Sequence, residues 1–438
     1  MTKKKTYQLS QWLFVLFIVI LLVPAMQGIF RPVEVPPLKG DIRYAERPQV
    51  TVGGWFDETL QQNTESWVNQ HFGFRNTLVR LYNQWRFWLY GKSSARGVLI
   101  GKQNYLYEEN YIKAYYGRDF VGDSLISARV ETLKKIQDTL QSLGKTMVIC
   151  IAPGKGQFYP DYIPDDLRSD PSVTNYQTLI KEAKKQGLEL IDFNAWFLQM
   201  KDTSRYPLYP KTGIHWSHYG SELALDSLMR YIEQRQQVDI PDFAVKRRYV
   251  PDEMMAPEAD IEEGMNLLVD LDRFPMIYSD VSIENQEKPK LKIMVVSDSF
   301  FWQLHNRGFM SSVFDDGQFW YYNQTIYQPT IPAGRPVESA DVRQELLDKD
   351  VIVLLTTDAN LPAFPWGFDA LAYRALFVSD SAYKAQREEK IQGYIFAIKN
   401  TEAWLEQVRQ KAIERQLPLD SMIRIDATYM VDMEEKKE

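Results

Sequence analysis

The segment Leu291-Lys-Ile-Met-Val-Val-Ser-Asp-Ser-Phe300 is an apolar run followed directly by short polar residues. The run Ile293–Val296 is typical of a buried strand, and the aromatic residues Phe300–Trp302 indicate that a helix begins after a tight turn. In an open α/β sheet, ligands and reacting groups lie at the carboxyl ends of strands. Ser299 would therefore stand near a helix N-terminus, whose free N–H groups can support an oxyanion. The alternative is that Ser297–Ser299 only cap the helix.

Strand and helix patterns alternate through the rest of the central region. Because β-α-β-α alternation is typical of parallel sheets, the sequence predicts an α/β fold with a mostly parallel sheet. The further strands are expected at Lys145–Ile151, Leu188–Phe193 and Asp350–Thr356, and the helices at Ser124–Leu143, Asn175–Gln186 and Glu222–Glu233.

The N-terminal region carries a membrane-spanning pattern. Lys3–Lys5 precede the uncharged stretch Thr6–Phe30, which at ~1.5 Å per residue is long enough to cross a ~30 Å hydrocarbon core. The lysines favour the cytoplasm, so the remainder of the chain is expected outside it. A cleaved signal peptide is the alternative, because Val23-Pro24-Ala25 has small residues at a suitable spacing.

The chain divides into four predicted parts. A membrane anchor or signal segment is followed by a Pro-rich stem, an α/β domain with an irregular acidic insertion, and a helical C-terminal segment. Their bounds are 1–30, 31–53, 54–380 with the insertion near 237–289, and 381–438.

Composition excludes several classes of protein. The net charge of −7 argues against a general nucleic-acid partner. Cys150 is the one cysteine, which excludes an intramolecular disulfide framework and a multi-cysteine metal site. No cofactor is expected.

Two of the four histidines, His215 and His218, lie in the loop Tyr209–Gly220 before a predicted helix. A histidine at a loop-to-helix junction is a candidate general base, and a structural role is the alternative. The pair could also bind a metal ion, but the sequence offers no third ligand cluster, so no metal site is expected.

Several of these segments together resemble the alginate O-acetyltransferase family, whose exported members carry an SGNH-hydrolase-like domain. The resemblance covers roughly residues 54–360. It is carried by Gly101-Lys-Gln-Asn-Tyr-Leu-Tyr107, Ala152-Pro-Gly-Lys155, Lys211-Thr-Gly-Ile-His-Trp-Ser217 and Ser297-Asp-Ser-Phe300. It implies an SGNH-hydrolase-like α/β/α sandwich preceded by one transmembrane helix, with Ser299 as the nucleophile and His215 as its base.

The sequence departs from the family pattern at two positions. The aspartate that would orient the histidine falls on Gly213, and the glycine before Asp-Ser falls on Ser297. Asp192 and Asp358 could substitute because each follows a strand, and Asp298 beside the serine is a further candidate for support. Otherwise the site is a dyad or has lost catalysis. If the acid is missing, Gly213→Asp should raise activity.

The resemblance implies O-acetylation of an exported or cell-surface polysaccharide by Ser/His acyl transfer. It also implies a single-pass protein of the inner or cytoplasmic membrane with a periplasmic catalytic domain, supplied with acetyl groups by a membrane-bound O-acyltransferase. A carbohydrate O-acetyl esterase and an inactive glycan-binding or assembly subunit are the alternatives.

Overall fold

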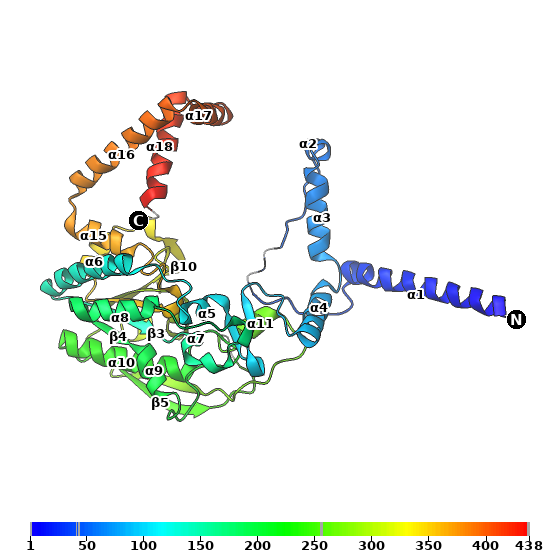
Figure 1. Ribbon diagram of the computed structural model, residues 1–438, viewed down its shortest axis with the longest axis horizontal. Coiled ribbons are helices and arrows are strands. Elements are labelled where there is room, and N and C mark those ends of the chain that lie inside the picture. The colour runs from blue at the N-terminus through cyan, green and yellow to red at the C-terminus, as the bar shows by residue number, and fades with distance from the viewer. Residues whose placement is uncertain (1, 41, 43, 255–256, 436–438) are drawn as a thin grey trace.

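The computed structural model describes residues 2–40, 42, 44–254 and 257–435, and its centre is a seven-stranded mixed sheet (Figure 1). From edge to edge the strands are β10 (Ile331–Pro336), β9 (Thr325–Gln328), β8 (Asp315–Tyr321), β7 (Lys292–Ser297), β11 (Val351–Thr357), β3 (Thr146–Ala152) and β4 (Leu190–Asp192). The strands from β8 to β4 are parallel, and β9 pairs antiparallel with both β8 and β10. The predicted α/β fold with a mostly parallel sheet is confirmed.

Helices cover both faces of this sheet because successive strand residues point to opposite sides. In β3, Ile149 and Ile151 pack with one helical layer and Cys150 with the other. The first layer contains α6 (Asp123–Ser142), α8 (Asn175–Gln186), α14 (Val342–Asp348) and α15 (Phe368–Phe377). The second contains α5 (Glu109–Tyr115), α7 (Lys155–Phe158), α9 (Phe193–Met200), α10 (His218–Gln236), α12 (Trp302–Asn306) and α13 (Phe309–Ser312). The result is the α/β/α sandwich visible in Figure 1.

Short elements complete the domain at the carboxyl edge of the sheet. A hairpin is formed by β1 (Val98–Ile100) and β2 (Leu106–Glu108), which pair antiparallel. The 3₁₀ turns are η1 (Lys102–Asn104), η2 (Pro160–Tyr162), η3 (Asp165–Leu167), η4 (Ser299–Phe301), η5 (Val337–Ser339) and η6 (Asp358–Asn360).

The acidic insertion near 237–289 is more regular than predicted. It contains the antiparallel pair β5 (Asp242–Tyr249) and β6 (Tyr278–Glu284), with α11 (Asp260–Met265) between them. Phe243, Val281 and Ile283 pack against the main core. Their alternation with charged residues is a half-buried strand pattern that the acidic composition obscured.

The N-terminal helices extend away from the sandwich (Figure 1). They are α1 (Thr2–Phe30), α2 (Val52–Phe56), α3 (Thr59–His71) and α4 (Arg75–Tyr90). Within α1, Ser10–Phe30 is long and apolar enough to cross a membrane, with a mean hydropathy of 2.7.

The C-terminal helices form a core of their own. These helices are α16 (Asp380–Asn400), α17 (Glu402–Glu414) and α18 (Leu419–Glu435). Ile398, Val408 and Ala427 are fully buried among them.

Candidate active site

Ser299 begins the turn that follows β7, as the sequence predicted. Asp298 fixes this turn, because its Oδ1 accepts a hydrogen bond from the backbone N–H of Phe300 at 3.0 Å. Its Oδ2 accepts from the N–H of Thr357 at 2.9 Å and from Nδ2 of Asn360 at 2.8 Å. The buried Asp298 carboxylate therefore ties the ends of β7 and β11 together and holds the serine at the edge of the sheet.

His215 reaches Ser299 from the loop before α10. Ser217 caps that helix by accepting a hydrogen bond from the N–H of Gly220 at 2.8 Å, and the buried Trp216 anchors the loop in the core. Nε2 of His215 lies 2.9 Å from Oγ of Ser299, within hydrogen-bonding distance. The structure thus brings together the two residues named as nucleophile and base.

A carboxylate that the sequence analysis did not single out contacts the other ring nitrogen. Oδ2 of Asp260 lies 2.6 Å from Nδ1 of His215, and its Oδ1 accepts the N–H of Ile214 at 2.8 Å. Asp260 is the first residue of α11, in the insertion. Ser299, His215 and Asp260 therefore form a continuous Ser-His-Asp arrangement.

Gly213 explains why the acid comes from the insertion. A Cβ at position 213 would lie 2.6 Å from the carbonyl oxygens of both Pro257 and Glu258. The backbone that leads into α11 thus occupies the space where a side chain of residue 213 would be. The expectation that Gly213→Asp would raise activity depended on a missing acid, and that condition is not met because the Asp260 carboxylate contacts His215.

The two acids expected as substitutes lie elsewhere at the edge of the sheet. Asp192 caps α9 by accepting the N–H of Ala195 at 2.9 Å, and it also accepts the hydroxyl of Tyr176 at 2.7 Å. Asp358 is buried against Gly154, where an added Cβ would meet its carboxylate at 1.7 Å. The expectation that Asp192 or Asp358 replaces the missing acid is therefore corrected. Both residues lie at the carboxyl edge of the sheet instead.

Lys155 is a buried cation beneath the histidine loop. Its Nζ donates to the carbonyl oxygen of Lys211 at 2.9 Å and to that of Gly213. Burial lowers the pKa of Lys155 to about 7, against the opposing attraction of Asp260 and Glu108. In the sequence this lysine stands out only as part of the segment Ala152–Lys155, and no local pattern revealed that it would support the segment before His215.

Electrostatic effects on His215 favour the protonated ring. Burial alone would lower its pKa, but the carboxylates of Asp260, Asp298 and Glu108 outweigh burial and hold the pKa above its usual value. Because its pKa is raised, His215 readily keeps a proton once it has accepted one.

Tyr322 lies close to the nucleophile. Its backbone N–H donates to the carbonyl oxygen of Ser297 at 2.8 Å, and Ser299 is among the groups that affect the pKa of its hydroxyl. Burial raises the pKa of the Tyr322 hydroxyl, so this group stays protonated and able to donate.

His218 does not join His215 in a metal site. Its backbone N–H donates to Oε1 of Glu258 at 2.8 Å and its ring packs on Tyr278. Within the part of the chain that the structure describes, no group of three or more His, Cys, Asp or Glu residues is arranged to hold a metal ion.

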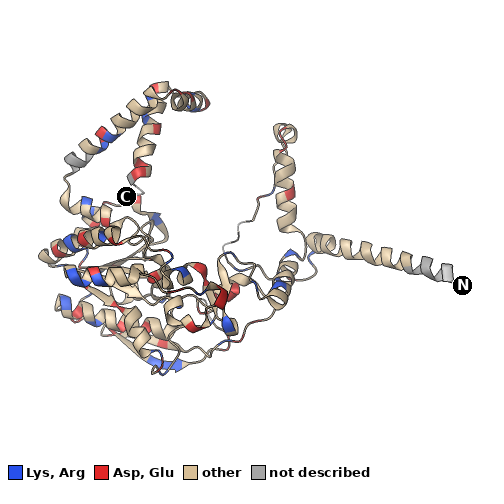
Figure 2. Cartoon of the chain, viewed as in Figure 1, with Lys and Arg blue, Asp and Glu red and all other residues tan. Residues whose placement is uncertain are grey.

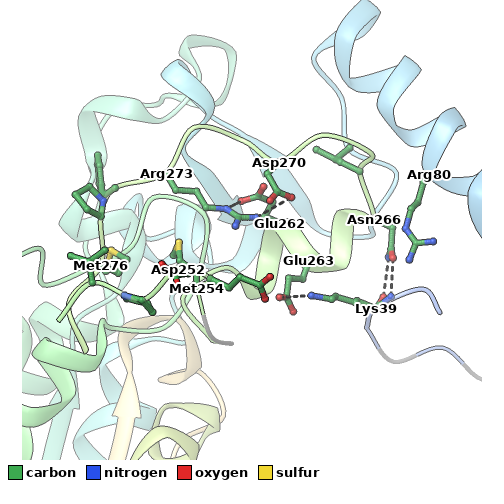
Figure 3. A pocket seen from close by; sticks show the side chains of 16 residues that line it. Lys39, Arg80, Asp252, Met254, Glu262, Glu263, Asn266, Asp270, Arg273 and Met276 are labelled. Atoms are coloured by element: carbon green, nitrogen blue, oxygen red, sulfur yellow. Dashed lines mark hydrogen bonds and ion pairs between the residues drawn. The ribbon is translucent and has the colours of Figure 1, made fainter. Parts of the chain in front are cut away.

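A cavity of about 650 Å³ lies on the side of α11 that carries Glu262 and Glu263 (Figure 3). Its lining includes neither Ser299, His215 nor Asp260. Lys39 of the stem reaches α11 here, with Nζ 2.6 Å from Oε1 of Glu263 and its backbone N–H donating to Oδ1 of Asn266 at 2.8 Å. The stem therefore contributes part of the lining of this cavity.

Residues 98–256 match the family described as "SGNH hydrolase-like domain, acetyltransferase AlgX". The match supports the resemblance to the alginate O-acetyltransferase family over about a third of the chain. The matched segment includes His215, whereas Asp260 and Ser299 follow it in the chain.

Curated members of the family show the same similarity. The chain is 26% identical over 144 residues to the "Probable alginate O-acetylase AlgJ" of Pseudomonas syringae pv. tomato, covering 33% of this chain and 35% of that protein. It is 25% identical over 145 residues to the protein of that name from Pseudomonas aeruginosa, with the same coverage. The matches thus span about a third of the length of these relatives.

Solved structures of the alginate O-acetyltransferase family were compared as well. The O-acetyltransferase domain of Pseudomonas putida AlgJ is 17% identical with a TM-score of 0.43, covering 64% of this chain and 99% of that domain. Pseudomonas aeruginosa AlgX is 11% identical with a TM-score of 0.40, covering 60% of this chain and 66% of that chain.

Proposed function

We propose that this protein is an exported, membrane-anchored polysaccharide O-acetyltransferase that works by Ser/His acyl transfer. The observation that supports the proposal is the Ser299–His215–Asp260 arrangement, with separations of 2.9 Å and 2.6 Å. The similarity to proteins named for alginate O-acetylation supports a polysaccharide as the acceptor.

In the first half-reaction, Oγ of Ser299 attacks the acetyl carbonyl of the donor while Nε2 of His215 takes the hydroxyl proton. The Ser299 N–H and the Tyr322 hydroxyl, whose pKa Ser299 affects, are the donors that we assign to the oxyanion of the tetrahedral intermediate. When the C–O bond to the donor breaks, His215 returns the proton to the departing oxygen and Ser299 is left acetylated.

In the second half-reaction, a sugar hydroxyl attacks the acetyl-serine and gives its proton to Nε2 of His215. The ester to Ser299 then breaks, and His215 returns the proton to Oγ. Asp260 holds the Nδ1 proton and stabilises the imidazolium in both halves. The acceptor is a sugar hydroxyl for a transferase and water for an esterase, so both reactions use one site.

The proposed location follows from α1. The apolar span Ser10–Phe30 would anchor the chain, and Lys3–Lys5 would remain cytoplasmic, leaving the sandwich outside. A membrane-bound O-acyltransferase that delivers acetyl groups is part of the same proposal.

The test is acetyl transfer by the purified full chain, with p-nitrophenyl acetate as donor and uronate or neutral hexose oligosaccharides as acceptors. We expect p-nitrophenol release with acetylated oligosaccharide detected by mass spectrometry, and loss of both in Ser299→Ala. Release of free acetate alone would favour the esterase. The alternative of an inactive glycan-binding or assembly subunit was suggested by Gly213. A wild-type protein that released no p-nitrophenol would favour it.

A further inference from the structure

α4 buries polar side chains and exposes apolar ones, which is the reverse of an ordinary surface helix. Asn83 and Gln84 are buried: Nδ2 of Asn83 donates to the carbonyl of Met265 at 2.8 Å, and Oε1 of Gln84 accepts from the N–H groups of Leu268 and Val269 at 3.0 and 2.9 Å. The polar side of α4 therefore faces the protein.

The outward side of α4 is apolar and aromatic. The side chains recur at steps of three and four residues, which places them on one stripe, and each is between 45% and 65% exposed. They are Leu78, Leu81, Tyr82, Trp85, Trp88 and Leu89. A soluble surface rarely leaves so continuous an apolar stripe uncovered.

The stripe begins where the chain leaves α1. At the junction of α3 and α4, a Cβ on Gly73 would lie 2.2 Å from the carbonyl oxygen of Pro24 and 2.5 Å from the nitrogen of Gly28. The junction is thus pressed against the last turns of the Ser10–Phe30 span. Figure 1 shows α3 and α4 running crosswise to α1 from this point, and Figure 2 shows the apolar span of α1 without charged residues, unlike the sandwich helices.

We propose that the outward stripe of α4 lies in the headgroup layer of the bilayer that α1 crosses. A helix crosswise to a membrane span runs along the surface, and Trp, Tyr and Leu on one side with cations nearby are typical of interfacial helices. Exposed Lys92 and Arg96 follow α4 directly and can meet lipid phosphates. The inference rests on α1 as a membrane anchor and is independent of the acetyl-transfer chemistry.

The test uses a fluorescent nitrobenzoxadiazole label on single cysteines of the full chain. The native Cys150 is fully buried and stays unlabelled in the folded protein. The stripe positions are Leu81→Cys and Trp88→Cys, and the matched control is Gln141→Cys, at an exposed position of α6 on the sandwich. Each protein is reconstituted in vesicles of phosphatidylethanolamine and phosphatidylglycerol, with or without phosphatidylcholine that carries a nitroxide near its headgroup.

We expect the nitroxide lipid to reduce the fluorescence of both stripe labels by about twofold or more and to leave the control label unchanged. Equal, unquenched fluorescence at all three positions would overturn the proposal, and so would a chain that fails to float with the vesicles. Labels that are shielded from water but not quenched would show that protein, such as a second copy of this chain, covers the stripe.

A second variant tests the stripe itself. Trp85→Gln/Trp88→Gln/Leu89→Gln should release α4 from the lipid, so the quenching of a label at Leu81→Cys falls toward the control while flotation through α1 persists. Its matched control is Phe396→Gln/Ile413→Gln/Tyr429→Gln, which changes exposed apolar residues of the C-terminal helices. Unchanged quenching in the α4 variant would contradict the proposal.

Discussion

The carboxylate of Asp260 lies 2.6 Å from Nδ1 of His215, although 45 residues separate the two in the chain. The same carboxylate accepts the N–H of Ile214, so it fixes both the ring and the backbone that carries it. The Asp260 carboxylate therefore joins the loop before α10 to the insertion near 237–289. This contact can be tested directly.

Asp260→Asn should lower kcat for acetyl transfer by about 10⁴-fold, because the amide favours the wrong imidazole tautomer and gives no charge to stabilise the imidazolium. The variant should also move the acidic limb of the kcat/KM profile to lower pH. Asp260 raises the pKa of His215 against the effect of burial, so without its charge the ring loses its proton more easily. Asp192→Asn is the control and should retain both rate and profile, since Asp192 caps α9. A large loss in Asp192→Asn with little loss in Asp260→Asn would refute the assignment.

Gly213→Ala and Gly213→Asp should both lower activity and stability. The new Cβ would meet the carbonyl oxygens of Pro257 and Glu258 at 2.6 Å and displace the segment that carries Asp260. Overpacking of this kind costs about 1–3 kcal/mol, measured by urea unfolding. Gly264→Ala on α11 is the matched control, because its Cβ would meet nothing within 4 Å. A faster Gly213→Asp enzyme would show that Asp260 does not act as the triad acid.

Lys155→Met should weaken the fold by about 1–3 kcal/mol at pH 9, since it leaves the carbonyl groups of Lys211 and Gly213 without their donor. The pKa of Lys155 is about 7 in the folded chain and 10.5 in the reference state, so the unfolded chain binds more protons between these values. The stability that Lys155 contributes consequently rises with pH through this window. Urea unfolding should give a larger difference between wild type and variant at pH 9 than at pH 7. A difference that shrinks as pH rises would contradict the depressed pKa.

Asp358→Asn should raise the melting temperature at pH 8.5 and change it little at pH 4. Burial raises the pKa of Asp358 from 3.8 to about 7, so between these values the folded chain binds more protons and stability falls as pH rises. The neutral amide removes that loss. Asp166→Asn, at an exposed position, serves as the control and should show no such pH dependence. Equal effects of Asp358→Asn at both pH values would argue against a buried, proton-holding carboxyl.

The layered fold follows from local patterns that the sequence displays openly. The runs that became β3, β7 and β11 are apolar and short, and the helices between them carry apolar residues at helical spacing. Such patterns reflect burial directly, so the α/β architecture could be predicted from them. The order of the strands in the sheet could not. Ser299 and His215 could be named because each follows a strand or loop signal and matches a family motif.

Asp260 could not be found in this way because its role depends on a tertiary contact. In sequence it is one of several acids in the insertion, and no spacing relates it to His215. The decisive signal was indirect: a glycine at 213 leaves room for another backbone, but only the structure shows that Pro257 and Glu258 fill that room. The direction of the apolar face of α4 was hidden for a similar reason, since periodicity defines a face without saying what it meets.

The contact of Lys39 with α11 sets a boundary for making an anchor-free enzyme. Lys39 binds Glu263 and Asn266, and the carbonyl oxygens of Pro36 and Pro37 accept hydrogen bonds from Arg80 of α4. Cutting the chain just after residue 40 would remove the contacts of the stem with both α11 and α4. A shortened protein that starts at Val33 discards the apolar span but keeps them, so the proline-rich stem belongs with the α/β domain when the protein is produced without that span.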